Sequence, residues 1–260
     1  MLLRYGAHPS QYGVLTLPDI PGPWPVAVVL HGGFWRTRHG AELGEPLAAD
    51  LVDHGLATWN VEYRRVGEDL AAGGGGWPHT CLDVAAAVDL LAGAGQSAAG
   101  GLLDLSRVVA IGHSAGGHLA GWLATRPTLP PGAPGAAPVV PVLGFVSQAG
   151  VLDLVDGERQ DLGSGAVVGL MGSTAAEAGS DYALASPIER LPLGVPSVCV
   201  HGTADDVVPL RQSERFVLAA QRSGDASRLE AVAEADHTAL IDTRSLSWLA
   251  CRQAVLELLA

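Results

Sequence analysis

Short apolar runs alternate along the chain with segments in which apolar residues recur at helical spacing. The apolar runs are bounded by turn-forming residues, so we expect strands at 14–17, 26–30, 57–62, 108–112, 143–147, 197–200 and 229–233. The runs that begin at Val26, Val108 and Ser197 are apolar on both alternating faces, as strands covered by helices on both sides should be. Helical spacing predicts helices at 41–54, 80–91, 115–125, 211–222 and 245–259.

This alternation of strands and helices predicts an α/β fold with a mostly parallel central sheet and helices on both faces. Three stretches are expected to be loops: the glycine-rich 71–78, the Pro/Gly/Ala-rich 128–138 and the polar 156–180. Only 156–180, which holds one short apolar piece at 166–171, offers room for a small lid. Since it is too short for a second domain, we expect residues 1–260 to form one domain.

The apolar run that starts at Val108 ends in Gly112-His113-Ser114-Ala115-Gly116, which matches G-x-S-x-G between a predicted strand and a predicted helix. Small residues at both ends of this turn let strand and helix approach closely. Ser114 would then stand at the helix N-terminus, where free N–H groups favour developing negative charge. We therefore expect Ser114 to be a nucleophile and the Ala115 amide to be one oxyanion donor. The alternative is an ordinary strand–helix turn with an N-cap serine.

A serine nucleophile needs a base, and the base needs an orienting carboxylate. Asp205 follows the apolar strand 197–200, and His237 follows the last predicted strand, so the chain order is Ser, Asp, His. Asp206 is the neighbouring alternative and is expected to cap or contact the next helix; Glu234 and Asp236 are weaker rivals. His113 is expected to line the pocket or pack beneath it, His118 to be structural, and His201 to hydrogen-bond backbone.

A second glycine turn, HGGFW at residues 31–35, ends another buried strand. Glycines there let the loop turn its amides toward the serine, so Gly33 or Phe34 is the expected second oxyanion donor. His31 is expected to anchor the loop by hydrogen bonds. Trp35 is a candidate for the substrate pocket, with a core position as the alternative, and the same choice holds for Trp77.

Composition narrows the classes of protein further. A net charge of −12 argues against nucleic acid and anionic membrane surfaces as partners. No stretch is apolar enough for a membrane span, and the N-terminus lacks a signal pattern, so a cytoplasmic protein is expected. Cys81, Cys199 and Cys251 form no metal or redox pattern and are expected to be buried reduced thiols. No metal or organic cofactor is required by the chemistry above.

The segments HGGFW, GHSAGGHLA, HGTADDVVP and ADH, in this order, resemble the α/β-hydrolase superfamily. The nearest branches are small acetyl-xylan/feruloyl-type esterases, hormone-sensitive-lipase-like esterases and kynurenine formamidases that carry HGG-aromatic-Trp. VEYRR at 61–65 and Trp77-Pro78 with the segment 83–88 are similar to what these enzymes place between oxyanion loop and nucleophile. Phe34 replaces the third glycine of HGGG, which favours the HGG-aromatic-Trp subgroup.

The resemblance implies a serine hydrolase that cleaves small acyl esters through an acyl-enzyme. An arylformamidase that hydrolyses an N-formylkynurenine-type amide is the main alternative, and a short-peptide peptidase of the prolyl-oligopeptidase type is a weaker one. Two other classes stay open: a catalytically inactive binding protein and a lyase on the same fold. The expected partner is thus a small-molecule ester or amide; the sequence leaves the acyl preference undetermined and a homodimer open.

Overall fold

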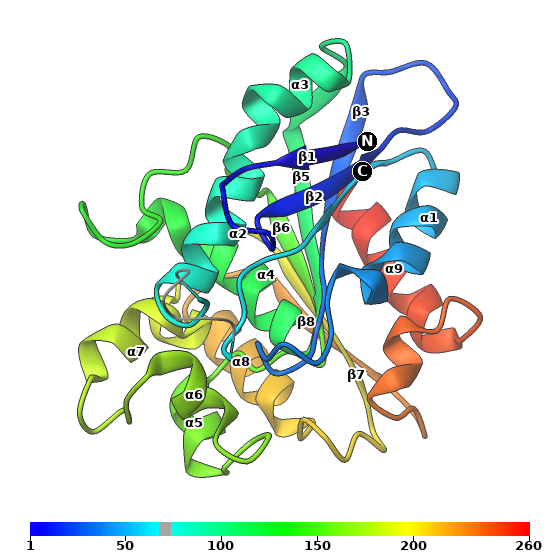
Figure 1. The fold of residues 1–260 in the computed structure, drawn as a ribbon. Coiled ribbons are helices and arrows are strands. Elements are labelled where there is room, and N and C mark those ends of the chain that lie inside the picture. The colour runs from blue at the N-terminus through cyan, green and yellow to red at the C-terminus, as the bar shows by residue number, and fades with distance from the viewer. Residues whose placement is uncertain (68–73) are drawn as a thin grey trace.

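The computed structural model describes residues 1–67 and 74–260 of the 260-residue chain, and Figure 1 shows its elements around one central sheet. The eight strands of this sheet lie in the order β1-β2-β4-β3-β5-β6-β7-β8. The pairs β1–β2 and β2–β4 are antiparallel, and all the pairs from β4 to β8 are parallel. The expected α/β fold with a mostly parallel sheet is confirmed.

The strands are β1 (Leu2–Arg4), β2 (Tyr12–Thr16), β3 (Trp24–Leu30), β4 (Ala57–Val61), β5 (Leu103–His113), β6 (Gly144–Gln148), β7 (Ser197–Gly202) and β8 (Ser227–Val232). The longer helices are α1 (Glu45–Asp53), α2 (His79–Asp89), α4 (Ala115–Thr125), α8 (Arg211–Arg222) and α9 (Leu246–Leu259). Four shorter helices complete the described chain: α3 (Ala94–Ala98), α5 (Leu154–Arg159), α6 (Ala166–Met171) and α7 (Gly179–Ala185).

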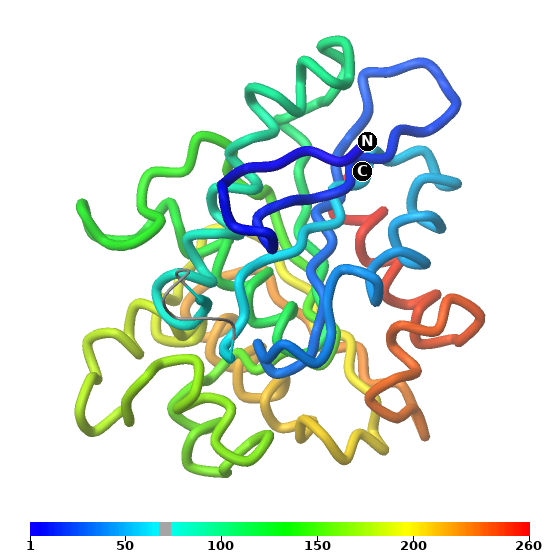
Figure 2. The backbone as a smooth tube through the Cα atoms, viewed as in Figure 1, coloured from blue at the N-terminus to red at the C-terminus, as the bar shows by residue number. Residues whose placement is uncertain are grey.

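The helices cover the sheet on two faces, and the tube view of Figure 2 separates the two groups. On one face α1 and α9 pack against the side chains of Ala27, Val29, Val109 and Ile111. On the other face α2, α4 and α8 pack against the alternate residues of the same strands, among them Val28 and Ala110. Both faces of β3 and β5 are therefore buried, which explains why the two apolar runs show no alternation.

Most expected elements are present, with shifts at their ends. The segment 41–54 is divided into a 3₁₀ turn at Ala41–Gly44 and helix α1, because Pro46 at the start of α1 removes an amide from the helical ladder. Strand β1 was not expected from the sequence, since three residues are too few to show a pattern. The expected loop 71–78 begins at residues that lie outside the described part of the chain.

The expected lid segment, 156–180, contains more helix than its composition indicates. It includes the end of α5, all of α6 and the start of α7, and α6 coincides with the apolar piece at 166–171. Figure 1 shows α5, α6 and α7 grouped together at one end of the molecule. Gly163 in this segment lies against the Phe34 ring, because a Cβ added to Gly163 would lie 2.8 Å from the ring atoms. The segment therefore packs on the HGGFW loop.

Candidate active site

Ser114 lies at the junction of β5 and α4 in a strained backbone conformation, with φ 54° and ψ −117°. A Cβ on Gly116 would overlap the carbonyl oxygen of Leu30 at the end of β3, and one on Gly112 would overlap the carbonyl oxygen of Gly116. Both positions therefore require glycine for the helix to start this close to the strands. The Ser114 amide donates to Gln148 O on β6 at 2.8 Å, which fixes the turn to the neighbouring strand.

Asp205 and His237 come from the loops after β7 and β8 and meet directly. His237 Nδ1 lies 2.7 Å from Asp205 Oδ2, and the amides of Val207 and Val208 each donate to Asp205 Oδ1 at 2.9 Å. An ionised carboxylate only accepts hydrogen bonds, so Nδ1 carries the proton and Nε2 is the free basic nitrogen. This is the arrangement that a general base needs.

The Asp205 carboxyl is held in its ionised form. Burial alone would raise its pKa, but hydrogen bonds from His201 and His237, together with the Val208 amide, outweigh burial and hold the pKa below its usual range. His201 Nε2 lies 3.3 Å from Asp205 Oδ2. His201 also contacts Val208 O and Ser213 Oγ, both at 2.8 Å, so the expectation that it bonds backbone is confirmed and a contact to the acid is added.

The other candidate acids lie elsewhere. Asp206 is exposed, and α8 begins at Arg211 without a side-chain cap, so the expected capping role of Asp206 is wrong. The reason is spacing: α8 begins five residues after Asp206, too far for its short side chain to reach the first turn. Asp236 instead accepts hydrogen bonds from the Thr238 and Ala239 amides and supports the turn that follows His237.

His113 lies beside the base as well as beside the nucleophile. Its Nε2 lies 2.9 Å from His237 O, and the two ring centroids are 4.4 Å apart. Burial, followed by the nearby His237 charge, lowers the pKa of His113 to about 3, so its imidazole is neutral near pH 7. His118 is fully buried and bonds Ala185 O at 2.9 Å, which agrees with a structural role.

The HGGFW loop crosses directly over the serine. A Cβ on Gly32 would lie 3.2 Å from Ser114 Cβ and 2.8 Å from His113 Nδ1, so only glycine fits between them. Gly33, Phe34 and Trp35 all have positive φ, at 116°, 52° and 57°. The amides of Gly33, Phe34 and Ala115 donate no hydrogen bond to any described residue, which leaves them free for a ligand.

The two tryptophans near this loop belong to the core. Trp35 is fully buried, packs edge-to-face on His118 with centroids 5.2 Å apart, and does not line the cavity described below. Its assignment to the substrate pocket is therefore replaced by the core alternative, because the backbone turn at Phe34 sends the next side chain inward. Trp77 packs edge-to-face on Trp122 at 6.4 Å, also against the core.

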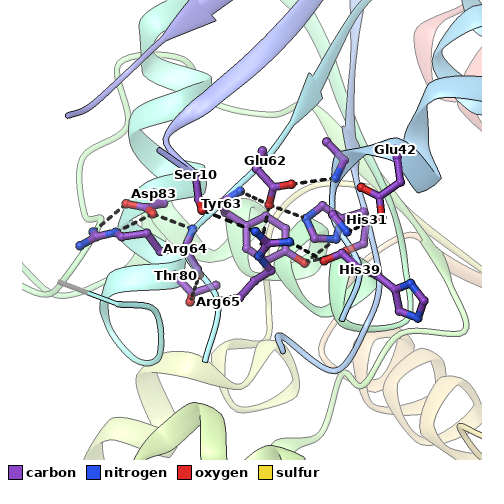
Figure 3. Close-up of polar contacts among 12 residues, drawn as sticks. Ser10, His31, His39, Glu42, Glu62, Tyr63, Arg64, Arg65, Thr80 and Asp83 are labelled. Carbon is purple, nitrogen blue, oxygen red and sulfur yellow. Dashed lines mark hydrogen bonds and ion pairs between the residues drawn. The ribbon is translucent and has the colours of Figure 1, made fainter. Parts of the chain in front are cut away.

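A buried polar network holds the HGGFW loop from behind, as Figure 3 shows. His31 Nε2 lies 3.1 Å from Glu62 Oε1, the Ala41 amide donates to Glu62 Oε2 at 2.8 Å, and Arg65 Nη1 donates to His39 O at 2.6 Å. The Tyr63 ring stacks on His31 at 4.2 Å and its hydroxyl donates to His31 O. The expectation that His31 anchors the loop is confirmed.

Glu62 is the residue of this network that sequence reasoning missed. Burial would raise its pKa, but the hydrogen bond and charge of His31, followed by the charge of Arg65, outweigh burial and lower the pKa. The available signal was an acidic residue directly after the buried strand β4, which neighbours β3 in the sheet. A carboxylate there needs a buried partner, and His31 directly follows the end of β3 at Leu30.

Ser114 and His237 open onto one cavity of about 530 Å³. Its walls come from the loop after β3 and from the loops that carry Asp205 and His237; they are Gly33, Phe34, Arg36, Arg38, His39, Leu43, His113, Ser114, Val207, His237, Thr238 and Ile241. The HGGFW loop and His237 thus face the same space. This volume lies within the usual range of small-molecule sites.

Residues 1–67 and 74–260 contain neither a candidate metal centre nor a candidate membrane-spanning helix. Within these ranges no group of three or more His, Cys, Asp and Glu side chains is arranged to hold a metal ion. No described helix has both the length and the apolar character needed to cross a membrane. Cys81, Cys199 and Cys251 are free and buried, as expected from their spacing.

Residues 15–219 match the BD-FAE family, which covers the nucleophile turn, the HGGFW loop and the Asp205 loop. The chain belongs to the BD-FAE family. As a BD-FAE family protein, it is an α/β-hydrolase. The family match ends before His237, so the position of His237 beside Asp205 is known from the structure alone.

A curated relative is similar to most of the length of this BD-FAE protein. Esterase LipC of Mycobacterium tuberculosis is 30% identical over 223 residues, which cover 82% of this chain and 53% of LipC. The chain therefore spans about half the length of that relative.

Solved structures share the fold at lower identity. The bifunctional GH43-CE protein of Bacteroides eggerthii has a TM-score of 0.80 at 22% identity, covering 99% of this chain and 38% of its own. The butyrate-bound esterase Est2 of the Planctomycetes species Thermogutta terrifontis has a TM-score of 0.77 at 19% identity, covering 99% of this chain and 92% of its own. At these identities the likeness supports the α/β fold.

Proposed function

We propose that this protein hydrolyses small carboxylic esters, with Ser114 as nucleophile, His237 as general base and Asp205 as the residue that orients the base. The observation that carries the proposal is the 2.7 Å contact between His237 Nδ1 and Asp205 Oδ2 at the same cavity as the strained Ser114. Without the carboxylate, the imidazole would have no fixed tautomer. With it, Nε2 can accept the serine proton during attack.

The reaction would run in two halves. Ser114 Oγ attacks the ester carbonyl while its proton passes to His237 Nε2, and the developing oxyanion is bound by the free amides of Ala115 and of Gly33 or Phe34. The imidazolium then protonates the leaving alcohol, and an acyl-serine remains. Water, deprotonated by His237, releases the acid. Each oxyanion donor is expected to contribute about 2.7–4 kcal/mol to transition-state stabilisation.

A small substrate is favoured by the size of the cavity and by its apolar walls at Phe34, Leu43, Val207 and Ile241. The similar Est2 esterase has been solved with butyrate and with propionate bound, which supports a short acyl chain here as well. The described chemistry uses no metal or organic cofactor.

The test is turnover of p-nitrophenyl acetate and butyrate beside N-formylkynurenine. We expect ester turnover that Ser114→Ala lowers by several orders of magnitude and that Ser223→Ala, an exposed serine outside the cavity, leaves intact. Clear preference for the formamide by kcat/KM would replace the ester assignment with arylformamidase. Labelling by a fluorophosphonate that persists in Ser114→Ala, or products that carry no ¹⁸O from labelled water, would contradict the mechanism.

A further inference from the structure

The charged side chains of the cavity differ in sign from the protein as a whole. The sequence holds 27 acidic and 15 basic residues, for a net charge of −12. The lining of the cavity nevertheless includes Arg36, Arg38 and His39 and, among the described residues, no Asp or Glu. A cation-lined cavity in an acidic protein concentrates the field of the arginines where the substrate enters.

The two arginines are presented in different ways. Arg36 is half-buried, and its Nη2 donates to Ser164 O of the segment 156–180 at 2.8 Å, which holds the guanidinium in place. The other N–H groups of Arg36 have no acceptor among the described residues. Arg38 is exposed and has no hydrogen-bond or ion-pair partner among the described residues. A guanidinium without a carboxylate partner is free to bind an anion with two parallel hydrogen bonds.

The loop that carries these arginines is anchored at both ends. At one end Gly32 is fitted against Ser114. At the other end Arg65 holds the His39 carbonyl, while Figure 3 shows the His39 imidazole pointing away from that network. Arg36 and Arg38 therefore lie on a fixed loop directly after the Gly33 and Phe34 amides. An anionic group bound there would be part of the same small molecule whose carbonyl lies beside Ser114.

We propose that the ester substrate carries a carboxylate, which Arg36 and Arg38 bind while Ser114 attacks the ester carbonyl. This inference rests on the proposed function for the identity of the nucleophile. The apolar walls of the cavity would hold the hydrocarbon part, and the arginines would fix the orientation of the molecule. A neutral ester of the same size would lack the charged hydrogen bonds and react with a lower kcat/KM.

Matched ester pairs test the proposal and show which side carries the charge. In the acyl arm, p-nitrophenyl hydrogen succinate is compared with its methyl ester. In the alcohol arm, 4-acetoxybenzoate is compared with methyl 4-acetoxybenzoate. For each pair the measured quantity is the ratio of kcat/KM for the charged ester to that for the neutral ester. The ratio measured for a variant is compared with the ratio measured for the wild type. Any difference in leaving-group reactivity between the charged and the neutral ester cancels in that comparison.

Arg38→Gln is expected to lower this ratio about tenfold in one of the two arms, the usual size for a charged hydrogen bond. Arg36→Gln should lower it in the same arm, and 0.5 M salt should weaken the effect. The control is Arg222→Gln, an exposed arginine on α8 that changes the net charge equally but does not line this cavity. The proposal is overturned if Arg38→Gln and Arg36→Gln change neither ratio more than Arg222→Gln does.

A binding measurement separates failure of the anion site from failure of the esterase proposal. Benzoate and benzamide are titrated by NMR into Ser114→Ala protein and into the same protein with Arg38→Gln or Arg36→Gln added. We expect Arg38→Gln to weaken benzoate about tenfold and to alter benzamide less. If no ester is turned over by the wild type but benzoate still depends on Arg38, the anion site stands and the esterase proposal fails. Benzoate affinity that is independent of both arginines overturns the anion site.

Discussion

The nucleophile turn and the loops that flank it are held by opposite means. At residues 112–117 the backbone of β5 and α4 is packed so closely that side chains are excluded, and Ser114 is strained by contacts between main-chain atoms. The loops at 31–40 and 201–208 are held instead by buried polar side chains, chiefly Glu62 for the first and Asp205 with His201 for the second. Steric packing therefore fixes the turn at Ser114, and hydrogen bonds to ionised carboxylates fix the two flanking loops.

The difference matters for what each region tolerates. Packing of backbone against backbone cannot relax, so adding one methyl group to the turn displaces α4. In a buried ion pair, an isosteric substitution of one partner keeps the shape of the side chain. The other partner is then left as a buried charge without its counter-charge. Substitutions in the turn should therefore reduce stability by overlap, whereas isosteric substitutions in the flanking loops should act through charge.

The largest expected effect tests the acid. Asp205→Asn keeps the shape of the side chain but removes its charge, so the tautomer of His237 is no longer set. We expect kcat to fall about 10⁴-fold, as when an orienting aspartate is neutralised in another Ser-His-Asp hydrolase. The protein should remain folded, which circular dichroism checks. Asp206→Asn is the matched control and should change kcat less than about twofold, because Asp206 is exposed and has no partner among the described residues. A larger loss in Asp206→Asn would make Asp206 the acid.

The next effect tests the loop that carries the second oxyanion donor. Glu62→Gln leaves His31 and Arg65 beside a neutral group, so we expect the free energy of unfolding to fall by about 3–5 kcal/mol. We also expect a lower kcat for the folded fraction, because the amides of Gly33 and Phe34 no longer point toward the oxyanion. Urea unfolding and single-turnover rates measure the two effects.

The control for Glu62→Gln is Glu257→Gln, which removes one partner of the exposed pair with Arg228. Exposed pairs contribute about 0–1 kcal/mol, so little change is expected. Equal destabilisation by the two variants would mean that the network behind the HGGFW loop does not hold it.

The strand–helix turn at Ser114 and the positions of Asp205 and His237 after their strands could be predicted from sequence because their causes are local. Glycines at 112 and 116 around a serine, between an apolar run and a helical pattern, leave few other structures. Asp205 and His237 were each placed by the strand that they follow. Their contact depends on β7 and β8 being neighbours, which the alternation of elements implies for a parallel sheet.

The support of the HGGFW loop could not be predicted in the same way. Glu62 and His31 are 31 positions apart, and their contact arises because β4 pairs with β3 in register. The direction of Trp35 depends on three successive positive φ angles, two of them at non-glycine residues, for which the sequence carries no signal. Helices α5 and α7 are too short, at six and seven residues, to show a helical period.

A substitution in the strand–helix turn at residues 112–117 is expected to reduce stability less than Glu62→Gln does. In Gly116→Ala the new Cβ would overlap Leu30 O, and we expect the free energy of unfolding to fall by about 3 kcal/mol, at the upper end of overpacking. Urea unfolding measures the loss, which should be the same at pH 6 and pH 8 because no charge is involved. Gly179→Ala is the control: it lies at the start of α7 with no atom near its added Cβ. Equal stability of the two variants would remove the steric account.

The smallest effect concerns pH. Burial lowers the pKa of His113 to about 3 and that of His118 to about 4, whereas the unfolded chain takes up these protons near 6.5. Between about pH 6.5 and 4 the unfolded state therefore binds more protons, and the free energy of unfolding decreases as the pH falls. Each histidine should contribute a slope of about 1.4 kcal/mol per pH unit in this window.

His118→Gln isolates one of these contributions, because glutamine can still donate to Ala185 O but does not titrate. Its free energy of unfolding should depend less steeply on pH than that of the wild type, by about 1.4 kcal/mol per unit between pH 6 and 4.5, as read from urea curves. His118 lies outside the cavity, so its neutrality comes from burial alone, whereas His113 is also affected by the charge of His237. An unchanged slope would mean that His118 is protonated in the folded protein.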